Sequence, residues 1–237
     1  MGAFQLLSFG PEGWGSQLAS GVWLTIRLAV ATLPFGLASG LLLAIMINGR
    51  NRMLSRAALV FTTIFRALPE LLTIFIIYYG LQFLIQAVVD AAWPGTSIEI
   101  NGFLAGLFAL GVVFASFASE IFVAGLRALP KGQAEAAHAL GLSRGTAFVS
   151  VIAPQLFRLT LPGVGNLWFV LLKDTALVSV ISLSDLMRQT TIAVSNTKQP
   201  IFFYGVTCLI YLCLSLVSGA VVALLEVRTN RAYRGAR

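Results

Sequence analysis

The chain has 237 residues, of which 58% are hydrophobic and only 11% are charged, whereas average soluble domains carry roughly 25% charged residues. Its mean hydropathy of +0.89 excludes an ordinary soluble domain and places the chain among polytopic membrane proteins. The formal net charge of +7 would suggest a nucleic-acid partner in a soluble protein, but here the basic residues cluster in loops, so we expect no nucleic-acid binding.

Five segments are apolar over the length of about 20 residues that a membrane-spanning helix needs. We therefore predict an all-α, polytopic helix bundle in the lipid bilayer that forms a single membrane domain over residues 1–237. The predicted spans are 22–47, 59–89, 103–126, a fourth that begins near residue 156, and 201–225. The second should break near Pro69. The fourth is interrupted by Pro162, and periodicity leaves open whether it ends at residue 172 or continues through "ALVSVISL".

The loop charges predict how this bundle is oriented. Arginine and lysine gather in segments 48–58, 127–158 and 228–237, whereas segments 1–21 and 90–101 contain neither. Because cytoplasmic loops carry the excess of basic residues, we expect the N-terminus on the periplasmic side and the C-terminus in the cytoplasm.

The basic loop at 127–155 contains two short predicted helices. Pro130 should end the third span, and "KGQAEAAHAL" is rich in strong helix formers. Gly141 suits the left-handed position that closes a helix, and Ser143 suits the N-cap of a second helix, which Pro154 should end. This helix pair either docks on a partner protein or packs only on its own bundle, and the residues leave both interpretations open.

A spaced motif in this loop resembles a known family. Its residues are Glu135, Ala136, Ala137, Gly141, Ile152 and Pro154, which is the pattern E-A-A, three residues, G, ten residues, I-x-P. This pattern resembles the EAA motif of bacterial ABC importer permeases, in which the loop is a coupling helix that sits in a cleft of the cytoplasmic ATPase. The resemblance implies a type I ABC importer fold. It assigns contact with the ATPase to Glu135, Ala136, Ala137, Gly141 and Leu142.

Other segments resemble the polar amino acid subfamily of these permeases. They are "RALPELLTIFIIYYGLQ", "ASEIFVAGLRALPKGQ" and "LPGVGNLWFVLLKDTALVSVISLSDL". The run "FRALPELL" is most similar to the histidine/lysine/arginine/ornithine and opine branch, and to its Q-type subunit, one half of a heterodimer. The resemblance implies import of polar or basic amino acids or opines across the bacterial inner membrane. The implied partners are a second permease subunit, two ATP-binding subunits and a periplasmic solute-binding protein.

The chain itself has no Gly-rich phosphate loop of the G-x-x-x-x-G-K-[ST] type, so we expect it to bind no cofactor and to rely on a separate ATPase rather than act as an enzyme. Two alternatives remain. One is a permease of the same type for other amino acids or small polar solutes. The other, from a different class, is a passive membrane channel. A membrane scaffold or intramembrane enzyme is disfavoured because no nucleophile and base stand out.

Ionisable residues inside apolar spans usually face the bundle or a cavity, because a charge in hydrocarbon is costly. We predict that Arg66 and Glu120 form a structural ion pair. Glu70 follows Pro69 at a broken helix, where transporters often bind substrate; it is either a substrate contact or a second partner for Arg66 on the same helix face. The remaining candidates for the substrate pathway lie in the fourth span: Asn166, Lys173, Asp174 and Thr175.

Two further residue types could suggest a metal site. His138 is the only histidine, and Cys208 and Cys213 are the only cysteines. None has neighbours at ligand spacing, so we expect no metal. Leu167 stands where members of the family often carry a polar residue after "GN", which puts side-chain recognition of substrate by this subunit in doubt.

Overall fold

The computed structural model describes residues 5–10, 13–181 and 183–234, and all regular structure in this part of the chain is helical. In chain order the elements are η1 (Gln5–Leu7), α1 (Gly15–Asn48), α2 (Arg52–Ala67), α3 (Glu70–Ala92), α4 (Gly102–Ala128), α5 (Lys131–Ala139), α6 (Arg144–Ala147), the π-helical turn η2 (Phe148–Ile152), α7 (Ala153–Asp174), the 3-10 helix η3 (Thr175–Ile181), α8 (Leu186–Thr197) and α9 (Pro200–Arg234). Five helical stretches are long and apolar enough to cross a membrane, which confirms the predicted number of spans.

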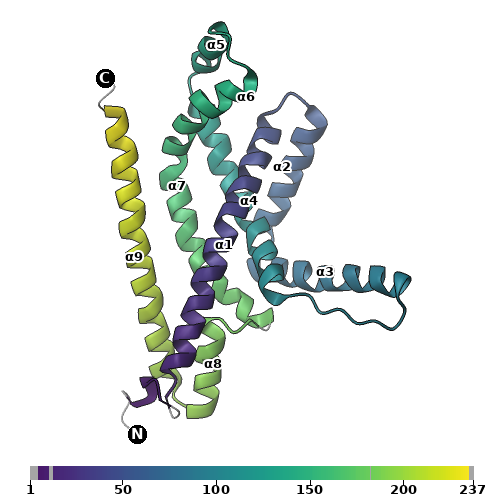
Figure 1. Ribbon diagram of the computed structural model, residues 1–237, viewed down its shortest axis with the longest axis vertical. Helices are drawn as coiled ribbons and strands as arrows, with labels where there is room; N and C mark the ends of the chain where they lie inside the picture. The colour runs from purple at the N-terminus through teal and green to yellow at the C-terminus, as the bar shows by residue number, and fades with distance from the viewer. Residues whose placement is uncertain (1–4, 11–12, 182, 235–237) are drawn as a thin grey trace.

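The long helices α1, α4, α7 and α9 run along the long axis of the molecule, while α3 runs across it (Figure 1). The loop formed by α5 and α6 lies at one end, together with the end of α9. Helix α8 lies at the other end, together with η1 (Figure 1). The first and last described elements therefore reach opposite ends of the bundle, as an odd number of spans requires.

Helices α1 and α4 form the centre of the bundle because small residues line their contact. A β-carbon at Gly40 would come 2.9 Å from Ala118 Cβ, and one at Gly36 would come 2.5 Å from Phe114 Cδ1, so glycine lets the two helices approach. The core around this contact contains Leu28, Ala44, Ile74, Ala109, Leu110, Phe114, Ala118, Phe122, Leu156, Leu171, Val178 and Ile181.

The predicted break near Pro69 is confirmed, but segment 59–89 forms two separate helices, α2 and α3, and the predicted extent of the second span is corrected. Leu68 and Pro69 both adopt extended backbone angles, with ψ of 143° and 131°. Proline disfavours helical angles in the residue before it and cannot donate a backbone hydrogen bond. The chain therefore changes direction here, and only α3 is long and apolar enough to span a membrane.

The fourth span is the longer of the two alternatives. Helical structure continues from Arg144 to Ile181 through α6, η2, α7 and η3. The prediction that Pro154 ends the second loop helix is therefore wrong. Pro154 lies in the first turn of α7, directly after the π turn, where a missing backbone N–H is tolerated.

Helix α8 was not among the predicted elements. Asp185 caps it by accepting hydrogen bonds from the backbone N–H groups of Met187 (3.2 Å) and Arg188 (3.0 Å). Leu186, Thr190 and Ala193 bury one face of the helix completely. The Thr190 hydroxyl lies 2.6 Å from that of Thr207 on α9, so α8 is fixed to the bundle by polar as well as apolar contacts.

Candidate functional site

The α5–α6 loop has the helix–turn–helix form that its sequence predicts. Helix α5 ends at Gly141, which adopts a left-handed φ of +78°. The backbone N–H of Gly141 donates to the carbonyl of His138 (2.9 Å), and that of Leu142 donates to the carbonyl of Ala137 (3.1 Å). These two bonds form a Schellman cap, in which a glycine closes the helix and satisfies its last carbonyls. The turn therefore sets the direction in which the chain leaves α5.

The second half of the loop begins at the predicted cap and leads directly into α7. The Ser143 hydroxyl accepts a hydrogen bond from the backbone N–H of Thr146 (3.2 Å) and starts α6. The π turn then joins α6 to α7, and the Gln155 side chain of α7 donates to Gln133 of α5 (3.4 Å). The loop is thus connected to α7 through the backbone and through a side-chain bond.

The loop exposes most of the residues assigned to ATPase contact, with one exception. Glu135, Ala136 and Gly141 are exposed, and Leu142 is half-buried. Leu140, at the tip, is 81% exposed. Ala137 is only 3% exposed, because its side chain faces inward where α5 packs on α6 and η2. The assignment of Ala137 to a partner contact is therefore corrected: this alanine packs within the loop.

A small, partly open cavity lies between α3, α4 and α7, and two carboxylates line it. Glu70 enters from the first turn of α3 and Asp174 from the end of α7. The other lining residues are apolar: Ile74, Leu110, Val113, Phe114, Phe117, Leu167, Val170 and Leu171. The cavity volume is about 20 Å³, which is room for about one water molecule. A larger solute therefore requires α3, α4 and α7 to separate.

Three of the residues predicted for the substrate pathway lie outside this cavity. Asn166 and Lys173 are exposed on other faces of α7, and the buried Thr175 hydroxyl donates to the carbonyl of Leu172 (2.7 Å). Leu167 lines the cavity in place of Asn166. Helix α7 is apolar on several sides, so its sequence gave no signal of which side faces the cavity. The aromatic lining from α4 also carried no sequence signal distinct from that of core packing.

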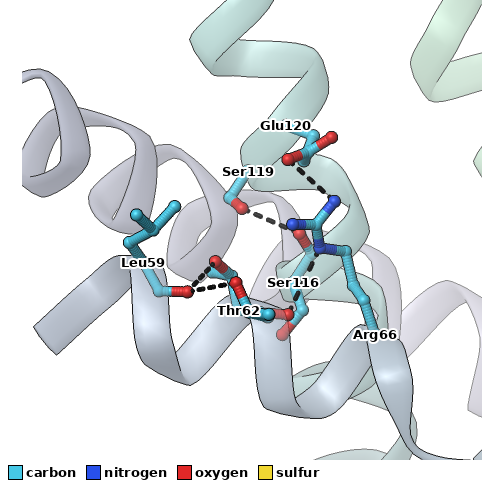
Figure 2. A network of polar contacts seen from close by, with 7 residues as sticks. Leu59, Thr62, Arg66, Ser116, Ser119 and Glu120 are labelled. Carbon is cyan, nitrogen blue, oxygen red and sulfur yellow. Dashed lines mark hydrogen bonds and ion pairs between the residues drawn. The ribbon is translucent and has the colours of Figure 1, made fainter. Parts of the chain in front are cut away.

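The Arg66 and Glu120 side chains join α2 to α4 (Figure 2). Arg66 Nη1 lies 2.7 Å from Glu120 Oε1, and Arg66 Nε donates to the carbonyl of Thr62 in its own helix (3.2 Å). The Arg66 side chain is 24% exposed and that of Glu120 is 58% exposed. The predicted partners therefore lie together, but they lie on an open surface of the chain and not in its core.

Glu70 does not lie on the same helix face as Arg66, so its reading as a second partner of Arg66 is corrected. The extended residues Leu68 and Pro69 separate the two side chains. Arg66 lies at the end of α2 and pairs with α4, whereas Glu70 opens α3 and lines the cavity with Asp174.

The family described as "Binding-protein-dependent transport system inner membrane component" matches residues 36–231 of the chain. The chain belongs to this family. It is therefore a multi-pass membrane permease of a transport system that uses a binding protein. This membership supports the importer reading and not the alternative of a passive channel.

Individual members of the permease family match almost the whole chain. The octopine transport system permease protein OccQ of Rhizobium meliloti is 37% identical over 234 residues, which cover 99% of each chain. The arginine ABC transporter permease protein ArtQ of Haemophilus influenzae is 38% identical over 222 residues, covering 94% of this chain and 97% of that protein. The crystal structure of an amino acid ABC transporter with histidines matches with a TM-score of 0.75 and 31% identity, covering 91% of this chain and 95% of that one. The expected permease fold and the resemblance to amino-acid and opine permeases are confirmed.

The described residues of this permease contain no group of three histidine, cysteine, aspartate or glutamate side chains that could hold a metal ion. Cys208 and Cys213 are free and exposed on α9.

Proposed function

We propose that this permease is the membrane subunit of an inner-membrane importer for basic or other polar amino acids, or opines. The proposed class of substrate is supported by two carboxylates, Glu70 and Asp174, in an otherwise apolar cavity lining. Carboxylates at a broken helix suit an ammonium or guanidinium group, and apolar walls suit an aliphatic stem. The arginine and octopine permeases among the relatives support the same class, since octopine and arginine both carry a guanidinium group.

The energy for import comes from two separate ATP-binding subunits, one of which docks on the α5–α6 loop of this chain from the cytoplasm. The loop supports this role because it presents Glu135, Ala136 and the exposed Leu140 beyond the end of the bundle. A small-residue helix allows a partner's backbone to come close. Movement of the docked ATPase would pass through η2 into α7, which carries Leu167, Leu171 and Asp174 of the cavity.

The complete importer contains a second homologous permease subunit and a periplasmic binding protein that delivers the substrate. In the conformation described, the cavity is too small for an amino acid. Alternating access therefore requires α3 and α7 to move away from α4, first toward one side of the membrane and then toward the other. No cofactor bound to this chain takes part.

The test of the substrate site is uptake of radiolabelled arginine by proteoliposomes that contain the assembled importer. Glu70→Gln and Asp174→Asn remove one cavity carboxylate each, and each should reduce uptake about tenfold or more, the range expected for loss of a charged hydrogen bond of about 1.5–3 kcal/mol. Lys173→Gln is the matched control, because Lys173 neighbours Asp174 but lies outside the cavity. Normal uptake by both cavity variants would remove these carboxylates from the substrate pathway.

The orientation is tested by reporters on the intact chain. A reporter fused after Arg237 should be cytoplasmic, and a tag inserted at Thr96, in the loop between α3 and α4, should be reached from outside the cell. Detection of both reporters on the same side of the membrane would contradict the proposed orientation.

A further inference from the structure

The ion pair between α2 and α4 lies on an open surface inside an apolar span. The Glu120 side chain is 58% exposed, although it lies in the membrane-spanning helix α4. A carboxylate at this depth does not face hydrocarbon without a large cost, so its open side faces water or another protein. The neighbouring serines do not cover it, because Ser116 and Ser119 donate to backbone carbonyls of their own helix (2.9 Å and 2.7 Å) (Figure 2).

Glu120 continues the face of α4 that lines the cavity. Leu110, Val113, Phe117 and Glu120 follow one another at steps of three and four residues, which places them on one helix face. The first three line the cavity. Exposure along this face rises from 3% at Leu110 and 5% at Val113, through the half-buried Phe117, to 58% at Glu120. The face therefore leads from the small cavity to an open surface on the side of the α5–α6 loop.

Arg66, which pairs with Glu120 on the open surface, is only four residues before the cavity residue Glu70. It lies at the end of α2, directly before the extended residues Leu68 and Pro69, and Glu70 on the other side of this break lines the cavity. Only Leu68 and Pro69 separate α2 from α3, so a movement of α3 away from α4 would act on the end of α2 that carries Arg66. The guanidinium keeps one bond to its own helix, at the carbonyl of Thr62, so it can leave Glu120 and remain anchored.

We propose that Glu120 is a second binding site for the cationic group of the substrate, on the path from the cavity to the cytoplasm. Arg66 is the resident counter-ion in the closed state. When the cavity opens, the ammonium or guanidinium of the substrate takes the place of the Arg66 guanidinium on Glu120, and Arg66 returns when the substrate leaves. This inference rests on the proposed function. It adds Glu120 to the substrate path as a third carboxylate, outside the cavity that Glu70 and Asp174 line.

The first test separates this role from that of a purely structural clamp. Glu120→Gln, Arg66→Gln and the double variant are compared in the assembled importer for melting temperature and for arginine uptake. Because the pair lies on an open surface, each single change should lower the melting temperature only slightly, and the double change should restore it. If Glu120 binds the substrate, the double variant should still import arginine about tenfold more slowly than the wild type, because the carboxylate is missing. Recovery of both stability and uptake in the double variant would overturn the proposal.

The second test asks whether Glu120 faces water. Cys208 and Cys213 are the only cysteines of the chain, so Cys208→Ser with Cys213→Ser gives a background without thiols. In this background, Glu120→Cys should react with a charged, membrane-impermeant thiol reagent applied from the cytoplasmic side. Leu216→Cys is the control, because Leu216 is 66% exposed on the apolar helix α9 and should not react. Protection of Glu120→Cys in every state of the transport cycle would show that protein covers this surface and would refute the proposal.

The two tests also separate this inference from the function on which it rests. A wild-type importer that takes up no arginine would contradict the proposed substrate class, and the thiol reaction would still decide whether Glu120 lies on an aqueous path. A wild-type importer that takes up arginine, with Glu120→Gln equally active, would retain the proposed function and reject the second binding site.

Discussion

The two ends of the bundle carry helical loops of opposite character. At one end, α5 exposes Glu135 and Ala136, and the tip residue Leu140 is 81% exposed. At the other end, α8 buries Leu186, Thr190 and Ala193 completely. A short helix gains most of its stability from packing, and α8 packs on its own chain, whereas α5 leaves the face that we propose for ATPase contact exposed. Changes at the two ends should therefore affect different properties: energy coupling at α5 and stability at α8.

The largest expected effect is that of Gly141→Val. A β-branched residue is unfavourable at a φ of +78°, by roughly 1–2 kcal/mol, so the angle between α5 and α6 should change while the membrane core stays intact. We expect arginine uptake to be abolished and the melting temperature of the bundle to stay the same. Gly145→Val is the matched control, because Gly145 has equally open surroundings without a left-handed φ, and it should keep uptake. Full uptake by Gly141→Val would mean that the α5 end has no special part in energy coupling.

Glu135→Lys should have the next largest effect, through the same surface. It reverses an exposed charge on α5 and should weaken the contact with the ATPase, so that less ATPase is recovered with the permease after detergent purification. Glu99→Lys is a matched charge reversal in the loop between α3 and α4 and should leave recovery of the ATPase unchanged. Equal recovery for both variants would argue against ATPase docking at Glu135.

Thr190→Val tests the α8 end. It leaves the buried Thr207 hydroxyl without its partner at 2.6 Å, which should lower the free energy of unfolding by about 1–3 kcal/mol and leave coupling between ATP hydrolysis and substrate unchanged. The double change with Thr207→Val replaces both hydroxyls by methyl groups and should recover most of this loss. Thermal unfolding in detergent measures the first effect and substrate-stimulated ATPase activity the second. Loss of coupling in the single variant would mean that α8 also controls transport.

The smallest expected effect is a pH dependence from Asp185. Burial raises the pKa of this carboxyl from 3.8 to about 6, although the backbone N–H groups of Arg188 and Met187 act in the opposite direction. The folded state therefore holds the proton more tightly than the unfolded state, and the stability contributed by the protonated carboxyl is lost as pH rises from about 4 to about 6. Asparagine caps a helix as well as aspartate does and carries no charge. The melting temperature of Asp185→Asn should exceed that of the wild type above pH 6 and match it near pH 4. A difference in melting temperature that is the same at both pH values would show that Asp185 does not titrate in this range.

The α5–α6 loop could be predicted closely because its signals are local. The role of Gly141 depends only on its own left-handed backbone angle, and that of Ser143 only on a hydrogen bond to a residue in the next turn. Both residues therefore act as the sequence predicts. The position of Ala137 could not be predicted in the same way. Whether an alanine faces a partner or its own loop depends on how α5 packs on α6 and η2, and its side chain carries no signal of either.

The cavity depends on contacts between distant segments, and the sequence predicted it only in part. Glu70 and Asp174 were both candidates, but that they line the same cavity follows from the turn at Leu68 and Pro69 and from the continuation of the fourth span through Asp174. That Leu167 and not Asn166 lines this cavity could not be predicted, because α7 is apolar on several sides. Helix α8 was missed although its buried residues recur at helical spacing, because the predicted helices were recognised as apolar segments of about 20 residues and α8 is too short and too polar to be one. Its burial comes from α1 and α9.

We propose that the α5–α6 loop couples a separate ATPase to substrate movement through this permease. The most direct measurement is ATP hydrolysis by the assembled complex in lipid nanodiscs, with and without binding protein loaded with arginine, for the wild type and for Gly141→Val. The wild type should hydrolyse ATP faster when loaded binding protein is added. Gly141→Val complexes that still contain the ATPase should hydrolyse ATP at one rate in both conditions. An equal stimulation of both proteins would contradict the account, because the angle between α5 and α6 would then have no part in coupling.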